Sequence, residues 1–446
     1  MPRVLIAGGG VAALELLLAL RVHAGARVAI TLLSADHALA PPAMTVAAPF
    51  GRGGAQTHDW REITADLGAR LVLDRLVAVE TDTRTAFTHG GRRIPYDVLV
   101  LATGARRVEP LAGALTFGMR GDAPAARLRE VVAELVAGRS ASLAFALAWP
   151  SSWSLPLYEL ALLTAHELRE HGSRAAVRIV TPEQRALELL GPAACEAVTP
   201  LLDALGVELT ESAQPRAVVD GGLRLDDGTI VEADHVVTLA DIVARPMAGL
   251  PADRAGFVPV DLHGRVTGER SVYAAGEVTS FPLRQGGVAA QQADVVAETI
   301  AARLAGETAE PAAFDPVLRG RLTTSGAPVY LQARPSGQSL ASHRAMWSPP
   351  EKVAGRYLAP YLATARPPSI ADSPLVERVP AEADAPGARP AAVTLALTLA
   401  AAEARCENRG RALQALDAAH ALDPGLRGDR ACVALRERLT EQVPAG

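Results

Sequence analysis

The stretch Ser271-Val-Tyr-Ala-Ala-Gly-Glu-Val-Thr-Ser-Phe-Pro-Leu-Arg-Gln-Gly-Gly-Val-Ala-Ala-Gln-Gln-Ala293 decides the fold of this chain. It predicts a buried strand that ends at Gly276 and Glu277, then a short loop, then a helix that opens with two glycines. Such a junction brings a carboxylate and free backbone N–H groups to one point, where the helix dipole favours negative charge. We therefore expect half of a ligand site here and its other half elsewhere in the chain.

The opening segment Val4-Leu-Ile-Ala-Gly-Gly-Gly-Val-Ala-Ala13 supplies that other half. An apolar strand, three glycines and an apolar helix over 12–21 fit the pattern G-x-G-x-x-A. Gly8 makes the turn, Gly10 lets a pyrophosphate approach the backbone, and the small Ala13 lets the helix pack closely on the strand. The pattern predicts a bound dinucleotide.

A second buried strand over 28–33 completes a β-α-β unit with a parallel sheet. The residue that binds the ribose of a dinucleotide belongs at the end of that strand. Ser34 stands there, and Asp36 is the nearest carboxylate. Because the two half-sites flank a long insertion, we expect one α/β domain interrupted by another.

Composition narrows the class of protein. The 446 residues carry a net charge of −5 without a basic run, which argues against nucleic acid as a partner. Cys195, Cys406 and Cys432 lack CxxC spacing, so neither a disulfide scaffold nor a metal site is expected. No apolar run is long enough to span a membrane, and the first strand leaves no room for a signal peptide. We expect a cytoplasmic protein.

The insertion reads as a second α/β unit. Its expected helices span 125–137, 156–171 and 193–205, and its expected strands span 141–148, 177–181 and 207–210. Other expected elements are strands over 70–80, 85–92, 97–102, 234–239 and 328–333, and a helix over 283–305. After a proline-rich linker, helices are expected over 393–408, 411–422 and 429–442, the first two separated by Gly410. Their pattern resembles a single tetratricopeptide-type hairpin, which would dock on its own body or on a partner.

A third motif, Tyr96-Asp-Val-Leu-Val-Leu-Ala-Thr-Gly-Ala105, ends a buried strand with small residues. Together with the two half-sites, in this order, it resembles the two-dinucleotide-domain FAD-dependent pyridine nucleotide-disulfide oxidoreductases. Within them the chain is most similar to the branch of sulfide:quinone oxidoreductases, flavocytochrome c sulfide dehydrogenases and type II NADH dehydrogenases. The resemblance covers roughly residues 1–365 and implies FAD, but no particular substrate.

The resemblance implies a division of the chain. Residues 1–110 and 238–305 would form the FAD-binding domain, 111–237 a degenerate NAD(P)-type Rossmann domain, and 306–365 a flavin-facing segment. A linker over 366–390 and a helical extension over 391–443 would follow. No flavin-linking Cys or His precedes the relevant loops, so we expect noncovalent FAD, although His37 lies close in sequence.

The resemblance also implies a set of cofactor-binding residues. Glycines and small residues would face the pyrophosphate and the flavin backbone, Glu277 would contact the ribityl region where the family usually has Asp, and the glycine-rich helix start would face the flavin's pyrimidine edge. The residues are Gly8, Gly10, Val11, Ala12, Ala13, Ser34, Asp36, Ala102, Thr103, Gly104, Gly276, Glu277, Gln285, Gly286, Gly287 and Val288. Arg284 stands where a lysine is common.

The second unit departs from the family's pattern for NAD(P)H. Aligned on Glu159, its three glycine places hold Ser152, Ser154 and Leu157, and Pro150 and Pro156 stiffen the same loop. Close approach of a pyrophosphate is therefore expected to be blocked. Sulfide:quinone oxidoreductases also lose this motif, but they place redox cysteines at positions that here are near Trp153 and Tyr330.

The candidate catalytic residues are Trp153, Tyr158, Glu159, Tyr330 and Lys352. With Trp347 and Tyr357, the aromatic members suggest a flat cavity for a quinone or another planar substrate, or else a packed core. Lys352 is the chain's only lysine, and Lys352 and Arg356 are expected to share one face of a helix.

Three functions stay open. The first is an FAD-dependent oxidoreductase that exchanges electrons with a quinone-like or other small planar substrate, with peripheral membrane contact allowed. The second is an NAD(P)H-dependent flavoprotein with an unorthodox nucleotide site. The third is a non-catalytic flavoprotein scaffold whose C-terminal helices recruit a protein.

Overall fold

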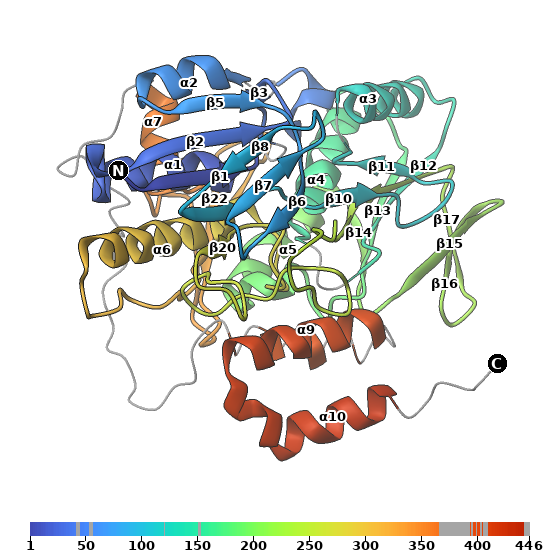
Figure 1. Cartoon of the computed structure of the whole chain (residues 1–446). Helices are drawn as coiled ribbons and strands as arrows, with labels where there is room; N and C mark the ends of the chain where they lie inside the picture. The colour runs from blue at the N-terminus through green and yellow to red at the C-terminus, as the bar shows by residue number, and fades with distance from the viewer. Residues whose placement is uncertain are drawn as a thin grey trace.

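A computed structural model describes residues 1–41, 45–52, 57–119, 121–149, 153–364, 393, 396–397, 399–401, 404 and 409–440. Two parallel sheets dominate it, each covered by helices (Figure 1). The predicted α/β class with Rossmann-like units is therefore confirmed. The proposed domain bounds themselves stay a prediction.

The first sheet combines strands that precede the inserted unit with one strand that follows it. Its strand order is β20-β9-β1-β2-β5, and all neighbours are parallel. The strands are β1 (Arg3–Ala7), β2 (Ala29–Ser34), β5 (Arg70–Leu73), β9 (Val98–Leu101) and β20 (Val272–Ala274). Apolar residues fill them because helices cover the sheet, and the edge strand β20 arrives only after the insertion.

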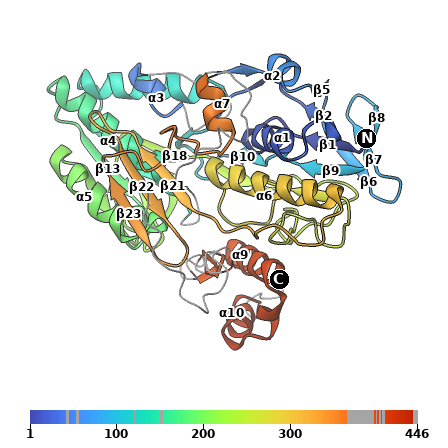
Figure 2. The same ribbon diagram turned by 90° about the vertical axis from the view of Figure 1, so that its left-hand side faces the viewer.

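Two long helices pack together on this sheet. They are α1 (Val11–His23) and α6 (Gly286–Ala305), which lie side by side in both views (Figure 2). The two helices bring the glycine-rich half-sites into contact, because Ala12 of α1 lies against Gly276, which follows β20. α2 (Trp60–Asp66) covers the far edge of the sheet, beside β5.

The expected strand over 70–80 is wrong as a single element. It divides into β5 and β6 (Leu76–Glu80), which belong to different sheets. β6 pairs antiparallel with β7 (Thr85–Thr88), and β7 with β8 (Arg93–Pro95). The break falls at Asp74, whose carboxylate accepts bonds from the N–H groups of Arg75 and Gly90 and so fixes a turn.

The second sheet has the order β11-β18-β12-β13-β14 and is again parallel. Its strands are β11 (Leu115–Phe117), β12 (Ser142–Ala146), β13 (Ala176–Val180), β14 (Glu208–Thr210) and β18 (His235–Leu239). Its helices are α3 (Ala123–Val136), α4 (Leu155–Glu170) and α5 (Pro192–Leu205). A three-stranded sheet of β15 (Pro215–Val219), β16 (Gly222–Leu225) and β17 (Ile230–Glu232) stands beside it.

The chain crosses between the two sheets through one antiparallel pair. These crossing strands are β10 (Arg106–Val108) and β19 (Asp241–Val243). A short pair, β3 (Ala38–Leu39) with β4 (His58–Asp59), lies after the first β-α-β unit. Of the two crossing strands, β10 begins directly after the third sequence motif.

A further three-stranded antiparallel sheet follows α6. It consists of β21 (Leu318–Leu322), β22 (Val329–Ala333) and β23 (Ser339–Ser342), and it packs on α4 and α5. The short helix α7 (Leu358–Thr364) then contacts α1. The segment over 306–365 thus touches both α/β units, the second through its sheet and the first through α7.

The C-terminal hairpin consists of α9 (Arg409–Leu422) and α10 (Arg430–Thr440). Gly410 does not separate two helices as expected, because it lies within α9. Most of the expected helix over 393–408 and the whole linker over 366–390 lie outside the described residues. None of the helices in the described ranges is long and apolar enough to cross a membrane.

Candidate functional site

The three sequence motifs meet at the carboxyl edge of the first sheet. A Cβ on Gly8, whose φ is +139°, would lie 1.9 Å from the carbonyl oxygen of Ala102. A Cβ on Gly276 would lie 3.3 Å from that of Ala12, and one on Gly104 would lie 3.7 Å from Oε2 of Glu277. Glycine at position 8 is thus required by the fold itself, because a larger residue would collide with backbone.

The carboxyl edge is also the open part of the sheet. The last residues of β1, β9 and β20 are buried, but Gly8–Val11, Thr103–Ala105 and Gly276–Glu277 are partly exposed. α1 starts at this edge with Gly10 as N-cap, and no side chain caps its first N–H groups. A partly open edge with uncapped N–H groups and glycines fits a dinucleotide pyrophosphate.

Glu277 has a partner that the sequence did not reveal. Its Oε1 lies 3.1 Å from Nη2 of Arg107, on the crossing strand β10. The backbone N–H of Gly276 donates to Oε1 of Gln292 at 2.7 Å, which fixes the turn before Glu277. Arg107 and Gln292 are ordinary residues in their own strand and helix, so only the tertiary fold identifies them as supports of this site.

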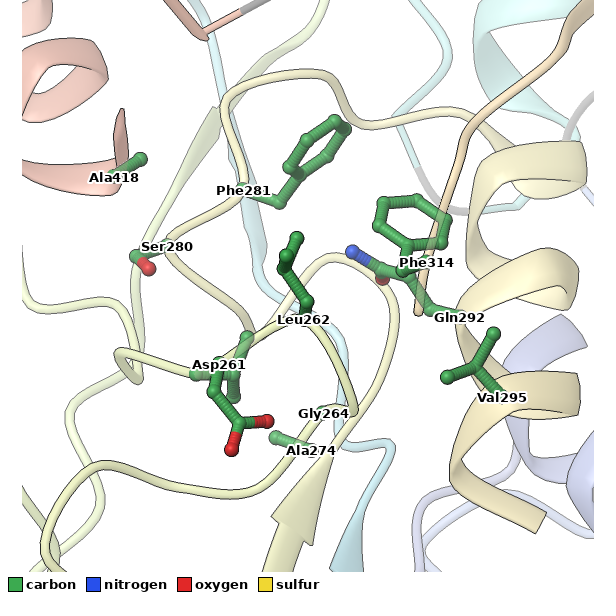
Figure 3. A pocket seen from close by; sticks show the side chains of 11 residues that line it. Asp261, Leu262, Gly264, Ala274, Ser280, Phe281, Gln292, Val295, Phe314 and Ala418 are labelled. Atoms are coloured by element: carbon green, nitrogen blue, oxygen red, sulfur yellow. The ribbon is translucent and has the colours of Figure 1, made fainter. Parts of the chain in front are cut away.

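A small cavity lies behind Gln292. Its volume is about 10 Å³, and Phe281 and Phe314 pack edge to face beside it at 5.3 Å between ring centroids (Figure 3). Ala418 of α9 lines its far side. About one water molecule fits such a volume, so this cavity is no substrate site. It lies between α9 of the C-terminal hairpin and α6, with Ala418 on the side of Ser280 and Gln292 on the other (Figure 3).

Arg284 lies beside the same turn. Its guanidinium stacks over the ring of Phe257 at 3.8 Å and donates to the carbonyl oxygen of Pro282. Burial lowers the pKa of Arg284 to about 10, although the negative charges of Glu277 and Asp253 act in the opposite direction. The residue that replaces the family's common lysine is therefore packed into the protein beneath the site.

The glycine-rich helix start begins later than the expected bound of 283. α6 begins at Gly286 because Gln285 is its N-cap, and Oε1 of Gln285 accepts from the N–H of Val288 at 2.8 Å. Nε2 of the same side chain donates to the carbonyl oxygen of Arg319. One N–H of the first turn is thus satisfied internally, and those of Gly286 and Gly287 precede it.

The ribose candidates behave differently from one another. Oγ of Ser34 donates to the carbonyl oxygen of Asp36 at 2.7 Å and closes a local turn, and Ser34 is fully buried. The Asp36 residue is exposed. A Cβ on Gly9 would lie 2.2 Å from Oγ of Ser34, and Trp60 is buried next to both with its Nε1 bonded to nothing in the described residues. Asp36 therefore remains a prediction for the ribose contact.

Lys352 reaches the second α/β unit. Its Nζ lies 2.6 Å from Oε1 and 2.8 Å from Oε2 of Glu159, a residue of α4 that is 1% exposed. The N–H of Thr323 donates to the same carboxylate at 2.6 Å. Val353, the next residue, lies 3.3 Å from the Cβ position of Gly286 at the start of α6. Two of the predicted catalytic candidates thus form one buried ion pair near the start of α6, which the sequence predicts to face the flavin.

The expected helical face of Lys352 and Arg356 is wrong. Residues 351–357 contain no helix, since α7 begins only at Leu358. Lys352 turns to Glu159, whereas Nη1 of Arg356 lies 3.1 Å from Oε1 of Glu298 on α6. Gly355 lies between them, and a Cβ there would be 2.7 Å from Oε2 of Glu15. The close packing at Gly355 favours an irregular turn over a helix.

Glu15 is a further residue that sequence reasoning missed. It is fully buried in α1 and accepts bonds from the N–H groups of Tyr357 and Leu358 at 2.8 and 2.6 Å. Its carboxyl also bonds with that of Asp294 on α6, and burial raises the pKa of both groups. One glutamate within the apolar run of α1 was the available signal. The pair ties the segment after Lys352 to both helices of the first sheet.

The candidate aromatic side chains do not line one cavity. Trp153 and Tyr158 pack in the core of the second unit, and Tyr330 and Trp347 pack edge to face at 5.1 Å. Tyr357 belongs to the core of the first unit. These residues separate because each ring is buried against its own neighbours, which supports the packed-core alternative.

The sequence predicts that the loop before α4 lacks the glycines of the family's NAD(P)H motif. The structure describes only part of that loop. Leu157 is fully buried in the core between helix and strand, and Ser154 is the N-cap of α4. Pro150 and Ser152 lie outside the described residues. Cys195 is on α5, with Sγ 3.8 Å from Oγ1 of Thr199. Cys432 is on α10, and Cys406 lies outside the described residues.

Comparisons with known proteins show what this chain is similar to. A family model described as pyridine nucleotide-disulphide oxidoreductase matches residues 159–294. An NADH dehydrogenase-like protein of Mycobacterium tuberculosis is 29% identical over 229 residues, which are 49% of this chain and 57% of that protein. The ferredoxin–NAD(+) reductase component of an anthranilate 1,2-dioxygenase system from Burkholderia cepacia is 31% identical over 239 residues, which are 50% and 52% of the two chains. The chain thus spans about half the length of the curated relatives it matches.

Among solved structures, the sulfide:quinone oxidoreductase of the hyperthermophilic bacterium Aquifex aeolicus is similar with a TM-score of 0.67. The match covers 77% of this chain and 87% of that chain at 17% identity. At such low identity the likeness shows a shared fold and carries no residue roles.

Proposed function

We propose, on the premise that the chain belongs to the FAD-dependent pyridine nucleotide-disulphide oxidoreductase family, that it is an FAD-dependent oxidoreductase. Noncovalent FAD would exchange electrons with a quinone-like or other small planar substrate. The family binds FAD, as the sequence predicted, and the open carboxyl edge of the first sheet fits that cofactor. When FAD is bound, it supplies the electron-transfer chemistry, and the protein positions it and sets the polarity of its surroundings.

The residues of the three motifs would hold the cofactor. The start of α1 at Gly10 would face the pyrophosphate, and Thr103 and Gly104 would approach the flavin from the loop between β9 and β10. Glu277, held by Arg107, would accept bonds from the ribityl hydroxyls. The N–H groups of Gly286 and Gly287 would face the pyrimidine edge, where a helix start favours negative charge.

One observation carries the proposal beyond a cofactor site, namely the ion pair of Lys352 with Glu159. A lysine that is the chain's only one, 11% exposed and paired with a carboxylate that is 1% exposed, is costly to bury without a function. Its Nζ would present a positive charge and a proton near the start of α6. Such a group can hold a proton beside a site where negative charge develops.

The cysteine pattern supports a reaction other than sulfide oxidation through a disulfide or persulfide. The chain has three cysteines, and the two positions that correspond to the redox cysteines of sulfide:quinone oxidoreductases hold Trp153 and Tyr330 or their neighbours. A thiolate is the nucleophile in that chemistry, and neither residue provides one.

A second candidate function is an NAD(P)H-dependent reductase. The names of the two curated relatives favour it, since one is NADH dehydrogenase-like and the other a ferredoxin–NAD(+) reductase component. Against it, the family match begins at Glu159, just beyond the three places where glycines are expected. We rank it second for that reason.

An anaerobic donor screen separates these functions. The purified protein is mixed with reduced quinones, sulfide, thiols, NADH and NADPH while the flavin band is followed. The proposal expects bleaching by a reduced quinone and an unchanged band with NADH and NADPH. Rapid bleaching by either nucleotide favours the second function, and a colourless protein that rejects added FAD rejects both. Roles for the C-terminal hairpin in binding a protein, and for the surface in peripheral membrane contact, remain predictions.

A further inference from the structure

The second α/β unit has the topology of a nucleotide-binding unit. In such a unit the phosphates lie at the start of the helix after the first strand, and the ribose lies beyond the carboxyl end of the next strand. Here these places are the start of α4, after β12, and the end of β13. A side chain of the protein itself bridges them: Glu183, which follows β13 by three residues.

Glu183 is bonded on both sides of that place. Its Oε1 accepts from Oγ of Ser154, the N-cap of α4, at 2.8 Å. Its Oε2 accepts from the hydroxyl of Tyr158, one turn into α4, at 2.8 Å, and from Oγ1 of Thr181 at 3.0 Å. Three hydroxyl donors therefore converge on one carboxyl group.

All four side chains are buried, and Glu183 is 1% exposed. Burial raises the pKa of Glu183 to about 7, while the bonds from Tyr158, Ser154 and Thr181 act to lower it. Above pH 7 the group is therefore mainly a carboxylate at the start of a helix. A helix start favours a negative group of this kind, whether it comes from a ligand or from the chain.

We propose that Glu183 is the specificity-determining residue that closes the second unit to NADH and NADPH. Its carboxyl group fills the space, and engages the hydroxyl donors, that a nucleotide phosphate or ribose would need. This inference deepens the proposed function, because it assigns the exclusion of nicotinamide nucleotides to an internal occupant. The lost glycines gave only a steric reason.

The bond between Tyr158 and Glu183 also affects the ion pair of Glu159 with Lys352. Tyr158 and Glu159 are neighbours on α4 and point to different partners, Glu183 and Lys352 respectively. Changing Glu183 can therefore disturb Glu159, so flavin content must be measured for every variant.

The test removes the occupant and offers a small anion in its place. Thermal unfolding of flavin-loaded full-length protein is measured at pH 8 with inorganic phosphate and with chloride at equal ionic strength. We expect Glu183→Ala to gain about 2–4 °C in Tm with phosphate at a concentration well above its Kd. The wild type and the control Glu208→Ala, which removes an exposed carboxylate on β14 of the same sheet, should not respond.

A neutral occupant gives the second arm. Glu183→Gln keeps the volume of the side chain, so we expect it to remain closed to phosphate and to NADPH, with the latter measured by calorimetric titration. If Glu183→Ala does not fold, Glu183→Ser takes its place in the phosphate arm, because serine also vacates the site.

Two results would overturn the inference. One is a Glu183→Ala protein with wild-type circular dichroism and flavin content that ignores phosphate. The other is NADPH binding by the wild type or by Glu183→Gln. Failure of the proposed function is distinguishable from both, because it consists of a flavin that no donor in the anaerobic screen reduces, whatever the response to phosphate.

Discussion

The two α/β units have the same order of strand, turn and helix, but they end differently at the carboxyl edge. In the first, Gly8 and Gly10 leave α1 uncapped and its edge partly open. In the second, Leu157 fills the space between helix and strand, and Glu183 bonds to the start of α4. One topology thus gives an open cofactor edge or a closed one, according to a few side chains at the turn.

The largest expected effect comes from the glycines of the open unit. Gly8→Val should prevent folding, because its Cβ would meet the carbonyl oxygen of Ala102 at 1.9 Å and its φ of +139° is unfavourable for valine. Gly10→Val should fold, because a Cβ there meets no atom within 4 Å, yet it should lose FAD. Soluble yield, circular dichroism and flavin absorbance separate the two outcomes. Wild-type flavin content in Gly10→Val would reject the predicted pyrophosphate position.

The ion pair that joins the two units comes next. Lys352→Met should lower the free energy of unfolding by about 3–5 kcal/mol, because it leaves the buried Glu159 carboxylate without its partner. Adding Glu159→Gln should restore most of that stability but no turnover. Urea unfolding and the rate at which a reduced quinone bleaches the flavin measure the two effects. If the double variant turns over at nearly the wild-type rate, the ion pair has only a structural role.

The closed unit should respond to pH. Burial raises the pKa of Glu183 to about 7 from an ordinary value of 4.5, so the folded state holds this proton more tightly than the unfolded state. Its contribution to stability is complete below pH 4.5 and is lost as the pH rises through 7, by roughly 3 kcal/mol in total. Glu183→Gln removes that slope. Denaturant titrations of both proteins between pH 4.5 and 8 test this, and parallel curves would contradict it.

The smallest effect is expected at the cysteines. Replacing Cys195, Cys406 and Cys432 by serine should leave turnover within about twofold of the wild type, because no predicted step uses a thiolate. A stability loss is expected at Cys432, which is 4% exposed. Steady-state rates with a reduced quinone give the measurement. If a folded triple variant has no turnover, sulfide oxidation through a cysteine becomes a candidate reaction again.

The sequence predicted the open unit far better than the connections between units. Gly8, Gly10 and Ala13 follow a local pattern, whose spacing alone carries the turn and the helix start. Lys352 and Glu159 lie far apart in the chain, and no periodicity relates them. Pairs of this kind depend on tertiary packing, which local patterns do not encode.

The misplaced aromatic cavity has the same origin. The scarcity of aromatic residues suggests a common cavity for Tyr158 and Tyr357, but it does not indicate the direction in which either side chain points. In the structure Tyr158 turns to Glu183 and Tyr357 turns to His23. Glu183 itself follows a predicted strand, yet a carboxyl group three residues beyond a strand is common in loops. Its role depends on the hydroxyls that reach it from α4.

The edge strand β20 has a consequence for how the protein is made. All five strands of the second sheet lie between residues 115 and 239, so the ribosome delivers that sheet whole before it delivers β20 at 272–274. The first sheet must wait with the side of β9 unpaired, and contacts that span so much chain form slowly. The nascent protein thus passes through an interval in which its interior module is finished and its outer module is not. Loading of the flavin must await β20 and the start of α6 at Gly286, which leave the ribosome only after the whole second sheet.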